Sequence, residues 1–333
     1  MEYRNLGRTG VRVSPLCLGC LNFGAKTTEA EGIQVMHRAM DLGINFFDTA
    51  NIYSLGQNEQ LIGKALAEDG RRDRMVLATK VRSPMGDGPN DWGNHRYHII
   101  PQCEASLRRL KTDRIDLYQL HRPDSAVPID ETLRALDQLI RQGKVLYIGT
   151  SHYAAWQLCE SLWVARELGL NRFISETPPF NILERRAERE LLPFCRTHGF
   201  AVIPWGPLSG GMLTGKYKPD GSAPPGSRFE AELPDSYAGC RKNRVFDVID
   251  ALHPLAKKKR CTLSQFVLSW CVHQPGITSP IIGPRTIQQL EDNVKALQVK
   301  LTNEDRKAVD QLVAPGDHVS DAYVADFGPH LYR

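Results

Sequence analysis

Four side chains that can hold or move a proton stand at or just beyond the ends of three apolar, strand-like runs. One run gives way to Asp48, with Tyr53 five residues further on, and the next two runs end in Lys80 and His121. Consecutive parallel strands are neighbours in a sheet, so their carboxyl ends can bring these side chains together. We therefore predict one site built from Asp48, Tyr53, Lys80 and His121 as catalytic residues.

The residue types suggest general acid catalysis on a developing alkoxide. A tyrosine has a pKa near 10 and is a poor acid at neutral pH, but a nearby ammonium such as Lys80 should lower that pKa. The Asp48 carboxylate would keep Lys80 charged, and His121 could donate a hydrogen bond to a substrate oxygen or relay a proton. Singly, such residues more often cap, pair or face solvent, so the prediction depends on all four.

Eight strand-like runs alternate with helix-like segments and must position these residues. The runs begin near Leu16, Ile44, Met75, Asp116, Val145, Phe173, Ala201 and Ile277. Helical apolar spacing follows Glu29, Asp130, Thr262 and Thr286, and we expect Asp130 and Thr302 to be N-caps. Eight alternations at this chain length, with no GxGxxG after any strand, favour a (β/α)8 TIM barrel over an open doubly wound sheet.

We predict a single domain over residues 1–333, because no change in composition marks a second one. It would open with a β-hairpin at 1–14 and end with a helix and tail at 302–333. Three stretches exceed normal loop length, at residues 82–97, at 207–241 and after Pro315. Loops that follow strands form the active face of a barrel, so we expect these long loops to be functional.

Composition narrows the class of protein. Lys and Arg number 42 against 38 Asp and Glu, a net charge of +4 that is too small to indicate a nucleic-acid partner. The basic run 257–260 is interpreted as a solvated helix end, and no apolar stretch indicates a signal segment or membrane insertion. Cys17 and Cys20 form a CxxC motif, but no second cysteine pair or nearby group of histidines accompanies it, which argues against a metal site. We expect a cytoplasmic protein, and the sequence shows no interface that would define an oligomer.

Three segments closely resemble motifs of the aldo-keto reductase superfamily: Phe47–Ala50 with Tyr53, Ala78–Lys80, and His121–Asp124. The resemblance extends from Asn5 to about Leu297. Within the superfamily, the sequence most resembles the bacterial members that are related to potassium-channel β subunits. The resemblance implies a (β/α)8 barrel that binds NADPH in an extended form. It also implies that Tyr53 is the general acid, that Asp48 and Lys80 tune it, and that His121 orients the substrate carbonyl.

The family pattern implies cofactor contacts from many strand ends and from one helix. Those residues are Gly19, Cys20, Asn22, Asp48, Ser151, His152, Thr177, Trp205, Gly206, Pro207, Leu208, Gly210, Gly215, Lys216, Gly283, Arg285, Thr286, Gln289 and Asn293. Trp205 is expected to stack on the nicotinamide, and Arg285 at a helix N-terminus suits a 2′-phosphate, which favours NADPH over NADH. Two residues depart from the pattern: His152 replaces the usual Asn, and Thr177 replaces a Gln that binds the carboxamide.

The predicted function is NADPH-dependent reduction of an aldehyde, ketone or sugar-like carbonyl, a small-molecule substrate. Phe23, Tyr53, Trp92 and His121 are expected to line the substrate pocket. An alternative is a cofactor-binding regulatory protein of the channel β-subunit type with slow turnover. A phosphate-handling barrel enzyme ranks lower because it leaves the four strand-end residues unexplained. The near match to a P-loop at 210–216 is followed by Tyr217, not Ser or Thr, which excludes nucleotide hydrolysis.

Overall fold

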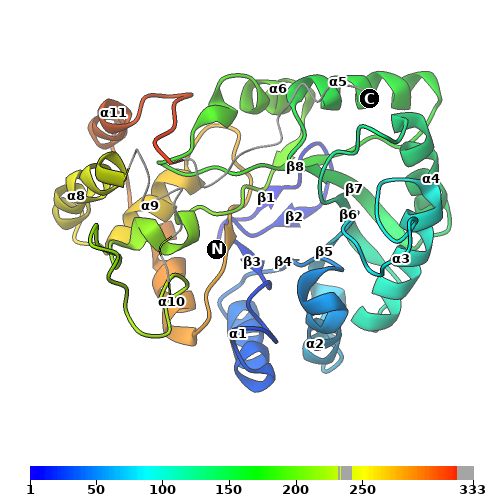
Figure 1. The fold of residues 1–333 in the computed structure, drawn as a ribbon, viewed down its shortest axis with the longest axis horizontal. Coiled ribbons are helices and arrows are strands. Elements are labelled where there is room, and N and C mark those ends of the chain that lie inside the picture. The colour runs from blue at the N-terminus through cyan, green and yellow to red at the C-terminus, as the bar shows by residue number, and fades with distance from the viewer. Residues whose placement is uncertain (232, 234–241, 321–333) are drawn as a thin grey trace.

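A computed structural model describes residues 1–231, 233 and 242–320 (Figure 1). A short antiparallel hairpin of β1 (Arg4–Asn5) and β2 (Arg12–Val13) precedes the main sheet, as predicted. The predicted tail beyond residue 320, and residues 232 and 234–241 of the second long loop, lie outside the described residues.

The described residues form a parallel sheet of eight strands with the order β10-β3-β4-β5-β6-β7-β8-β9. The strands are β3 (Cys17–Gly19), β4 (Phe46–Asp48), β5 (Val76–Val81), β6 (Ile115–Leu120), β7 (Val145–Ser151), β8 (Ser175–Thr177), β9 (Ala201–Val202) and β10 (Ile281–Ile282). Backbone N–H groups of Thr278 and Ile281 donate to the carbonyls of Val202 and Pro204 at 2.8 Å, so the sheet closes on itself. The predicted (β/α)8 barrel is confirmed.

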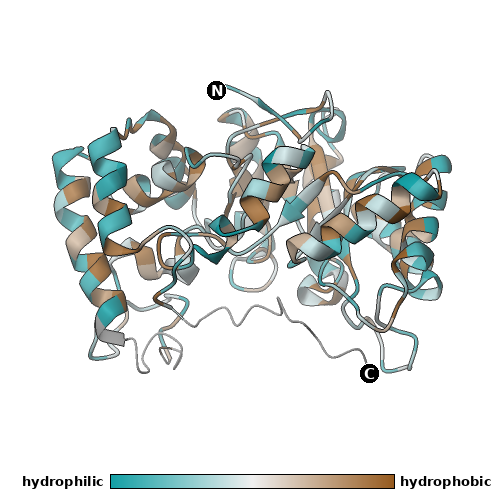
Figure 2. Ribbon diagram, turned by 90° about the horizontal axis from the view of Figure 1, so that it is seen from above, coloured by the Kyte–Doolittle hydropathy of each residue, from teal (hydrophilic) through white to brown (hydrophobic). Residues whose placement is uncertain are grey.

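Helices surround the sheet (Figure 1). They are α1 (Glu29–Asp41), α2 (Gln57–Leu66), α3 (Arg96–Leu110), α4 (Ile129–Arg141), α5 (Ala155–Glu167), α6 (Leu191–His198), α8 (Lys242–Lys258), α9 (Leu263–Val272), α10 (Ile287–Lys295) and α11 (Asn303–Leu312). On α4, Leu133, Leu136 and Leu139 recur every three residues and are fully buried. Figure 2 shows hydrophobic and hydrophilic residues interleaved along the helices, as one-sided burial requires.

Of the two predicted helix N-caps, Thr302 is confirmed and Asp130 is not. Thr302 caps α11, and its hydroxyl accepts a hydrogen bond from the backbone N–H of Asp305. The prediction for Asp130 is wrong, because α4 begins at Ile129 with Pro128 as its N-cap. Asp130 instead occupies the first turn, where its carboxylate faces the positive end of the helix dipole.

Side-chain alternation sets the layers inside the barrel. Phe46 and Asp48 lie two residues apart on β4, so both project inward, and Phe46 belongs to the inner apolar cluster. Ala78 and Lys80 repeat this pattern on β5, and Gln119 on β6 is the register partner of Lys80. The barrel interior therefore has a polar layer of Asp48, Lys80 and Gln119 at the carboxyl ends of the strands. An apolar layer that includes Phe46 and Ala78 lies next to it, toward the amino ends.

The basic run at 257–260 begins with the last two residues of α8 and continues past the helix end, as interpreted from the sequence, and within it Lys259 pairs with Asp305. In the part of the chain that the structure describes, no helix is long and apolar enough to cross a membrane.

Candidate active site

The four predicted catalytic residues come together at one side of a single cavity. Asp48 ends β4, Lys80 lies on β5, His121 follows β6 directly, and Tyr53 opens a short 3-10 helix, Tyr53–Gly56. Lys80 Nζ forms an ion pair with Asp48 Oδ1 and donates to the carbonyl of Thr49 at 2.9 Å. Lys80 Nζ is 5.6 Å from the centre of the Tyr53 ring, whose edge-on partner His121 lies 5.8 Å away. We call these four residues the buried end of the cavity.

Burial and pairing fix the charge of Lys80. Burial disfavours the ammonium, but the charge and hydrogen bond of Asp48 together with the Tyr53 and Cys17 side chains outweigh this effect, and the pKa of Lys80 is raised. Both side chains are almost inaccessible to solvent, at 3% and 4% exposure. Lys80 is therefore a permanent positive charge beside the Tyr53 phenol.

The sequence predicts a lowered pKa for Tyr53, and this prediction is wrong. Burial raises the pKa of Tyr53, and this effect exceeds the lowering caused by Lys80. The sequence could identify the nearby lysine but not the extent of desolvation. At neutral pH Tyr53 consequently keeps its proton, which is the form that a proton donor requires.

His121 is neutral. Burial, together with the positive charge of Lys80, holds the pKa of its imidazole well below the usual value. Among the described residues, His121 Nδ1 is buried without a hydrogen-bond partner. A buried polar atom of this kind costs free energy unless a ligand or water meets it, so the imidazole is available to a bound group.

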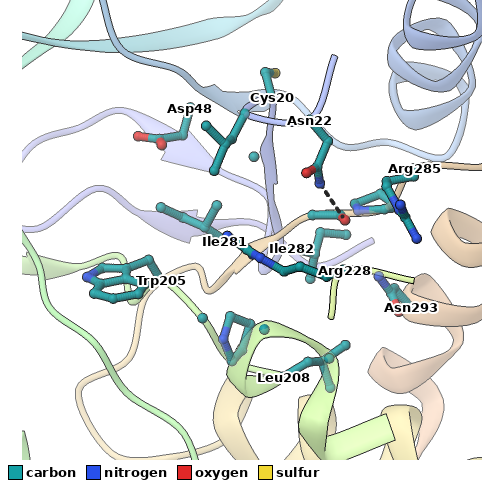
Figure 3. Close-up of a pocket in the computed structure, with 18 of the residues that line it drawn as sticks. Cys20, Asn22, Asp48, Trp205, Leu208, Arg228, Ile281, Ile282, Arg285 and Asn293 are labelled. Atoms are coloured by element: carbon teal, nitrogen blue, oxygen red, sulfur yellow. Dashed lines mark hydrogen bonds between the residues drawn. The ribbon is translucent and has the colours of Figure 1, made fainter. Parts of the chain in front are cut away.

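Most of the predicted cofactor residues line the same cavity, which has a volume of about 1140 Å³. They are Gly19, Cys20, Asn22, Asp48, Ser151, His152, Thr177, Trp205, Gly206, Pro207, Leu208, Gly210, Lys216, Gly283, Arg285, Gln289 and Asn293. Figure 3 shows Asp48 and Trp205 on one side of the cavity and Arg285 and Asn293 on the other. Asn22, which follows β3, donates to the carbonyl of Gly283, which follows the neighbouring strand β10, at 3.2 Å.

Four predicted residues do not line this cavity. Phe23 is fully buried against Gly32 of α1 and belongs to the core between the sheet and the helices. Trp92 is 42% exposed and packs against the Arg82 guanidinium, 5.1 Å from the ring centre.

Gly215 and Thr286 have local structural roles. Gly215 has a φ of +74°, and a Cβ there would lie 2.8 Å from His253 Nε2. The Thr286 hydroxyl caps α10 by accepting from the backbone N–H of Gln289 at 3.2 Å.

Sequence reasoning missed several lining residues, of which Arg228 is the most informative. It comes from the long loop after β9 and lines the cavity, where Figure 3 shows it with Arg285. Lys216 of the same loop also lines the cavity. We call these three residues the cationic end of the cavity. A basic residue in a Gly- and Pro-rich loop close to Lys216 was the available signal. The other missed lining residues are Leu21, Ala25, Lys26, Arg122, Gly211, Thr214, Phe229, Ser264, Ile281, Ile282, Pro284, Gln288 and Asp292.

The two departures from the family pattern have structural explanations. His152 has a φ of +63°, a left-handed conformation in which Asn and His are both enriched, so His can occupy a position that usually holds Asn. Its Nδ1 lies 2.8 Å from Ser151 Oγ, and its ring centre lies 5.3 Å from that of Trp205. Thr177 lines the cavity, and its hydroxyl donates to Gln119 Oε1 at 2.8 Å.

The lining residues fit an elongated anionic dinucleotide. The cationic end supplies three positive side chains, and the neighbouring Gly210 and Gly211 adopt φ of +65° and +101°, which glycine accommodates without strain. The N-terminus of α10 lies beside Arg285. No group of three or more potential metal ligands occurs in residues 1–231, 233 and 242–320.

Comparison with known proteins agrees with this architecture. The Aldo/keto reductase family profile matches residues 15–314. The chain is 41% identical to an uncharacterized oxidoreductase, YrpG, of Bacillus subtilis, over 97% of this chain and 99% of the relative. It is 38% identical to a probable voltage-gated potassium channel subunit beta of Arabidopsis thaliana, over 90% and 92% of the two chains. It is 33% identical to the aldo-keto reductase dtxS3 of Metarhizium robertsii, over 95% and 92%.

The family match covers nearly all of the barrel, and each relative aligns with this chain over almost its full length. These similarities support a general oxidoreductase function with a nicotinamide cofactor, the type that members of this family generally use. The chain belongs to the aldo/keto reductase family.

Proposed function

We propose that this protein is an NADPH-dependent reductase that converts an aldehyde, ketone or sugar-like carbonyl to the alcohol, with Tyr53 as the general acid. The observation that carries the proposal is the buried Lys80–Asp48 ion pair beside a protonated Tyr53 and a neutral His121. This arrangement supplies a proton donor and a hydrogen-bonding group at one place in a desolvated site. The remaining proposals are a single catalytic domain over residues 1–333 and a cytoplasmic location.

The dinucleotide, when bound, supplies a hydride to the carbonyl carbon. The Tyr53 hydroxyl donates its proton to the carbonyl oxygen, so hydride plus proton converts the carbonyl to an alcohol. The fixed positive charge of Lys80 stabilises the phenolate that Tyr53 becomes, and the His121 imidazole orients the oxygen. The proton is restored to Tyr53 from solvent before the next turnover.

The residues that would hold the cofactor divide between the two ends of the cavity. Ser151, His152 and Thr177 would meet the carboxamide, and Trp205 would stack on the nicotinamide ring. At the cationic end, Lys216 and Arg228 would bind the pyrophosphate, and Arg285 the 2′-phosphate that distinguishes NADPH from NADH.

A second candidate function has support from the comparisons. The relatives include proteins named as probable potassium channel β subunits in Arabidopsis thaliana and in rice, each 38% identical. A cofactor-binding regulatory protein with slow turnover would need the same cavity. The four residues of the buried end do not separate the two functions, whereas the rate of turnover does.

The experiment is a titration with NADPH followed by protein fluorescence, then addition of an aldehyde such as 4-nitrobenzaldehyde to the same cuvette. Trp205 lines the cavity, so we expect its fluorescence to be quenched on binding. Binding followed by aldehyde-dependent loss of NADPH absorbance would support the reductase. Binding without turnover across a panel of aldehydes, ketones and sugars would favour the regulatory function, and no binding would refute both.

A further inference from the structure

Gln119 is a fully buried polar residue on β6 that does not line the cavity. Its register partners are Lys80 on β5 and Gly149 on β7, so it lies at the level of the buried end. A Cβ on Gly149 would lie 2.2 Å from Ser175 Oγ and 3.3 Å from Gln119 Cγ. The glycine therefore leaves the space through which the Gln119 side chain reaches β8.

The Gln119 amide joins the buried end of the cavity to Thr177. Its Nε2 donates to Asp48 Oδ2 at 3.1 Å, and its Oε1 accepts from the Thr177 hydroxyl at 2.8 Å. An ionised carboxylate can only accept hydrogen bonds, so the amide nitrogen must face Asp48 and the amide oxygen must face Thr177. The orientation of the amide is thus determined by the chemistry of its neighbours.

These bonds extend a chain of contacts from the ion pair to the expected carboxamide site. Asp48 binds Lys80 with its other oxygen, and the backbone carbonyl of Thr177 accepts from Ser151 Oγ at 2.8 Å. Because the Thr177 hydroxyl gives its proton to Gln119, it can present only lone pairs to the cavity. An acceptor at this place suits the N–H groups of a carboxamide.

We propose that Gln119 is a positioning residue that holds Asp48 toward Lys80 and fixes the Thr177 hydroxyl as a hydrogen-bond acceptor for the cofactor carboxamide. Gln119 and Thr177 together replace the single longer glutamine that is usual at position 177. The part that concerns the cofactor rests on the proposed function, whereas the contact with Asp48 does not.

Gln119→Glu tests both contacts, because a protonated glutamic acid reproduces the amide. Its O–H can donate to Asp48 while its C=O accepts from Thr177, but an ionised carboxylate would face Asp48 as a like charge. The other titratable groups that act on Asp48 are Lys80, Tyr53, Cys17 and Cys20, and His121 interacts with Lys80. The variant should therefore behave as wild type in acid and lose its contacts as pH rises.

Two readouts should follow this pattern when the variant is compared with wild type at each pH. The unfolding midpoint of the cofactor-free variant should fall below that of wild type as pH rises from about 5 to about 9, by at least ~5 °C. Over the same range its dissociation constant for NADPH should rise about tenfold relative to wild type. Gln138→Glu, on the outer helix α4 beside Arg96, is the matched control and should show neither change.

The outcomes separate this inference from the proposed function. A midpoint difference that does not change with pH, or NADPH affinity equal to wild type at pH 9, would overturn the role of Gln119. A pH-dependent midpoint difference in a protein whose wild type binds no NADPH would support the contact with Asp48 and refute the proposed function.

Gln119→Met provides a second test if the glutamate variant does not fold. It removes both hydrogen bonds at nearly constant volume and leaves the Thr177 proton free to donate. Wild type should bind the 3-acetylpyridine analogue of NADP⁺, which lacks the carboxamide N–H groups, about tenfold more weakly than NADP⁺. This ratio should shrink in Gln119→Met, and an unchanged ratio would contradict the acceptor role of Thr177.

Discussion

At the buried end of the cavity, Lys80 and Asp48 have side chains only 3% and 4% exposed, whereas at the cationic end Arg228 is exposed and Lys216 and Arg285 are half-buried. Asp48 and Lys80 lie on strands, His121 follows one directly, and Tyr53 opens the short helix after β4; an ion pair and a hydrogen bond fix the position of Lys80. The cationic residues come from one long loop and from the segment after β10.

This difference separates two physical tasks. Desolvation raises the pKa of Tyr53 and lowers the pKa of His121, and the same loss of water strengthens the attraction between Lys80 and Asp48, which proton transfer needs. Partly exposed cations attract phosphate with little change in their own properties, and water screens them. We therefore expect changes at the buried end to alter the rate of reaction and changes at the cationic end to alter cofactor affinity.

The largest effect is expected for Tyr53→Phe. The substitution removes the proton donor and keeps the ring, so turnover should fall by roughly 10²–10⁴-fold while NADPH affinity stays within about twofold. Steady-state kinetics and a fluorescence titration measure the two quantities. Tyr97→Phe, an exposed position on α3, is the control. Turnover close to that of wild type would remove Tyr53 from its catalytic role.

A smaller effect is expected at the cationic end for Arg285→Ala. Loss of a charge-assisted bond to the 2′-phosphate should weaken NADPH binding about tenfold or more and leave NADH binding nearly unchanged. Arg38→Ala removes an ion pair with Glu291 of α10 outside the cavity and is the matched control. An equal loss for both cofactors would contradict the 2′-phosphate assignment.

The smallest effect on activity is expected at Glu176, a buried carboxyl on β8 behind the Ser151–His152 turn. Its oxygens accept from the Thr150 hydroxyl at 2.5 Å and from the backbone N–H of Tyr153 at 3.2 Å, and burial raises its pKa to about 8. The folded state then binds the extra proton between about pH 4.5 and 8, so wild-type stability falls as pH rises through this window.

Glu176→Gln should remove that loss, because the amide does not ionise. Chemical denaturation at about pH 5 and pH 9 should show a difference between variant and wild type that changes by on the order of 3 kcal/mol. The same difference at both pH values would mean that Glu176 does not titrate in this range.

Much of this site follows from the sequence because strand ends in a parallel barrel meet at one edge. Asp48, Lys80 and His121 each stand at or after an apolar run, so topology alone predicted that they would come together. Phe23 could not be placed in this way, because an aromatic residue near a pocket turn packs equally well into the core. Nor could sequence spacing reveal that burial outweighs Lys80 at Tyr53, since desolvation depends on everything that surrounds the phenol.

Long-range partners were also beyond the sequence. Gln119 stands in a strand two residues before His121, and only the closed barrel shows that it bonds to Asp48 and Thr177. Arg228 reaches the cavity from a loop whose path no periodicity describes.

The most direct test of the account is the single-turnover rate of NADPH oxidation by excess aldehyde, measured against NADPH concentration for Tyr53→Phe and Arg285→Ala together. We predict that Tyr53→Phe lowers the limiting rate and keeps the half-saturating concentration, whereas Arg285→Ala keeps the limiting rate and raises the half-saturating concentration. If each variant changed both quantities to a similar extent, the division of the cavity into a reacting end and a binding end would be contradicted.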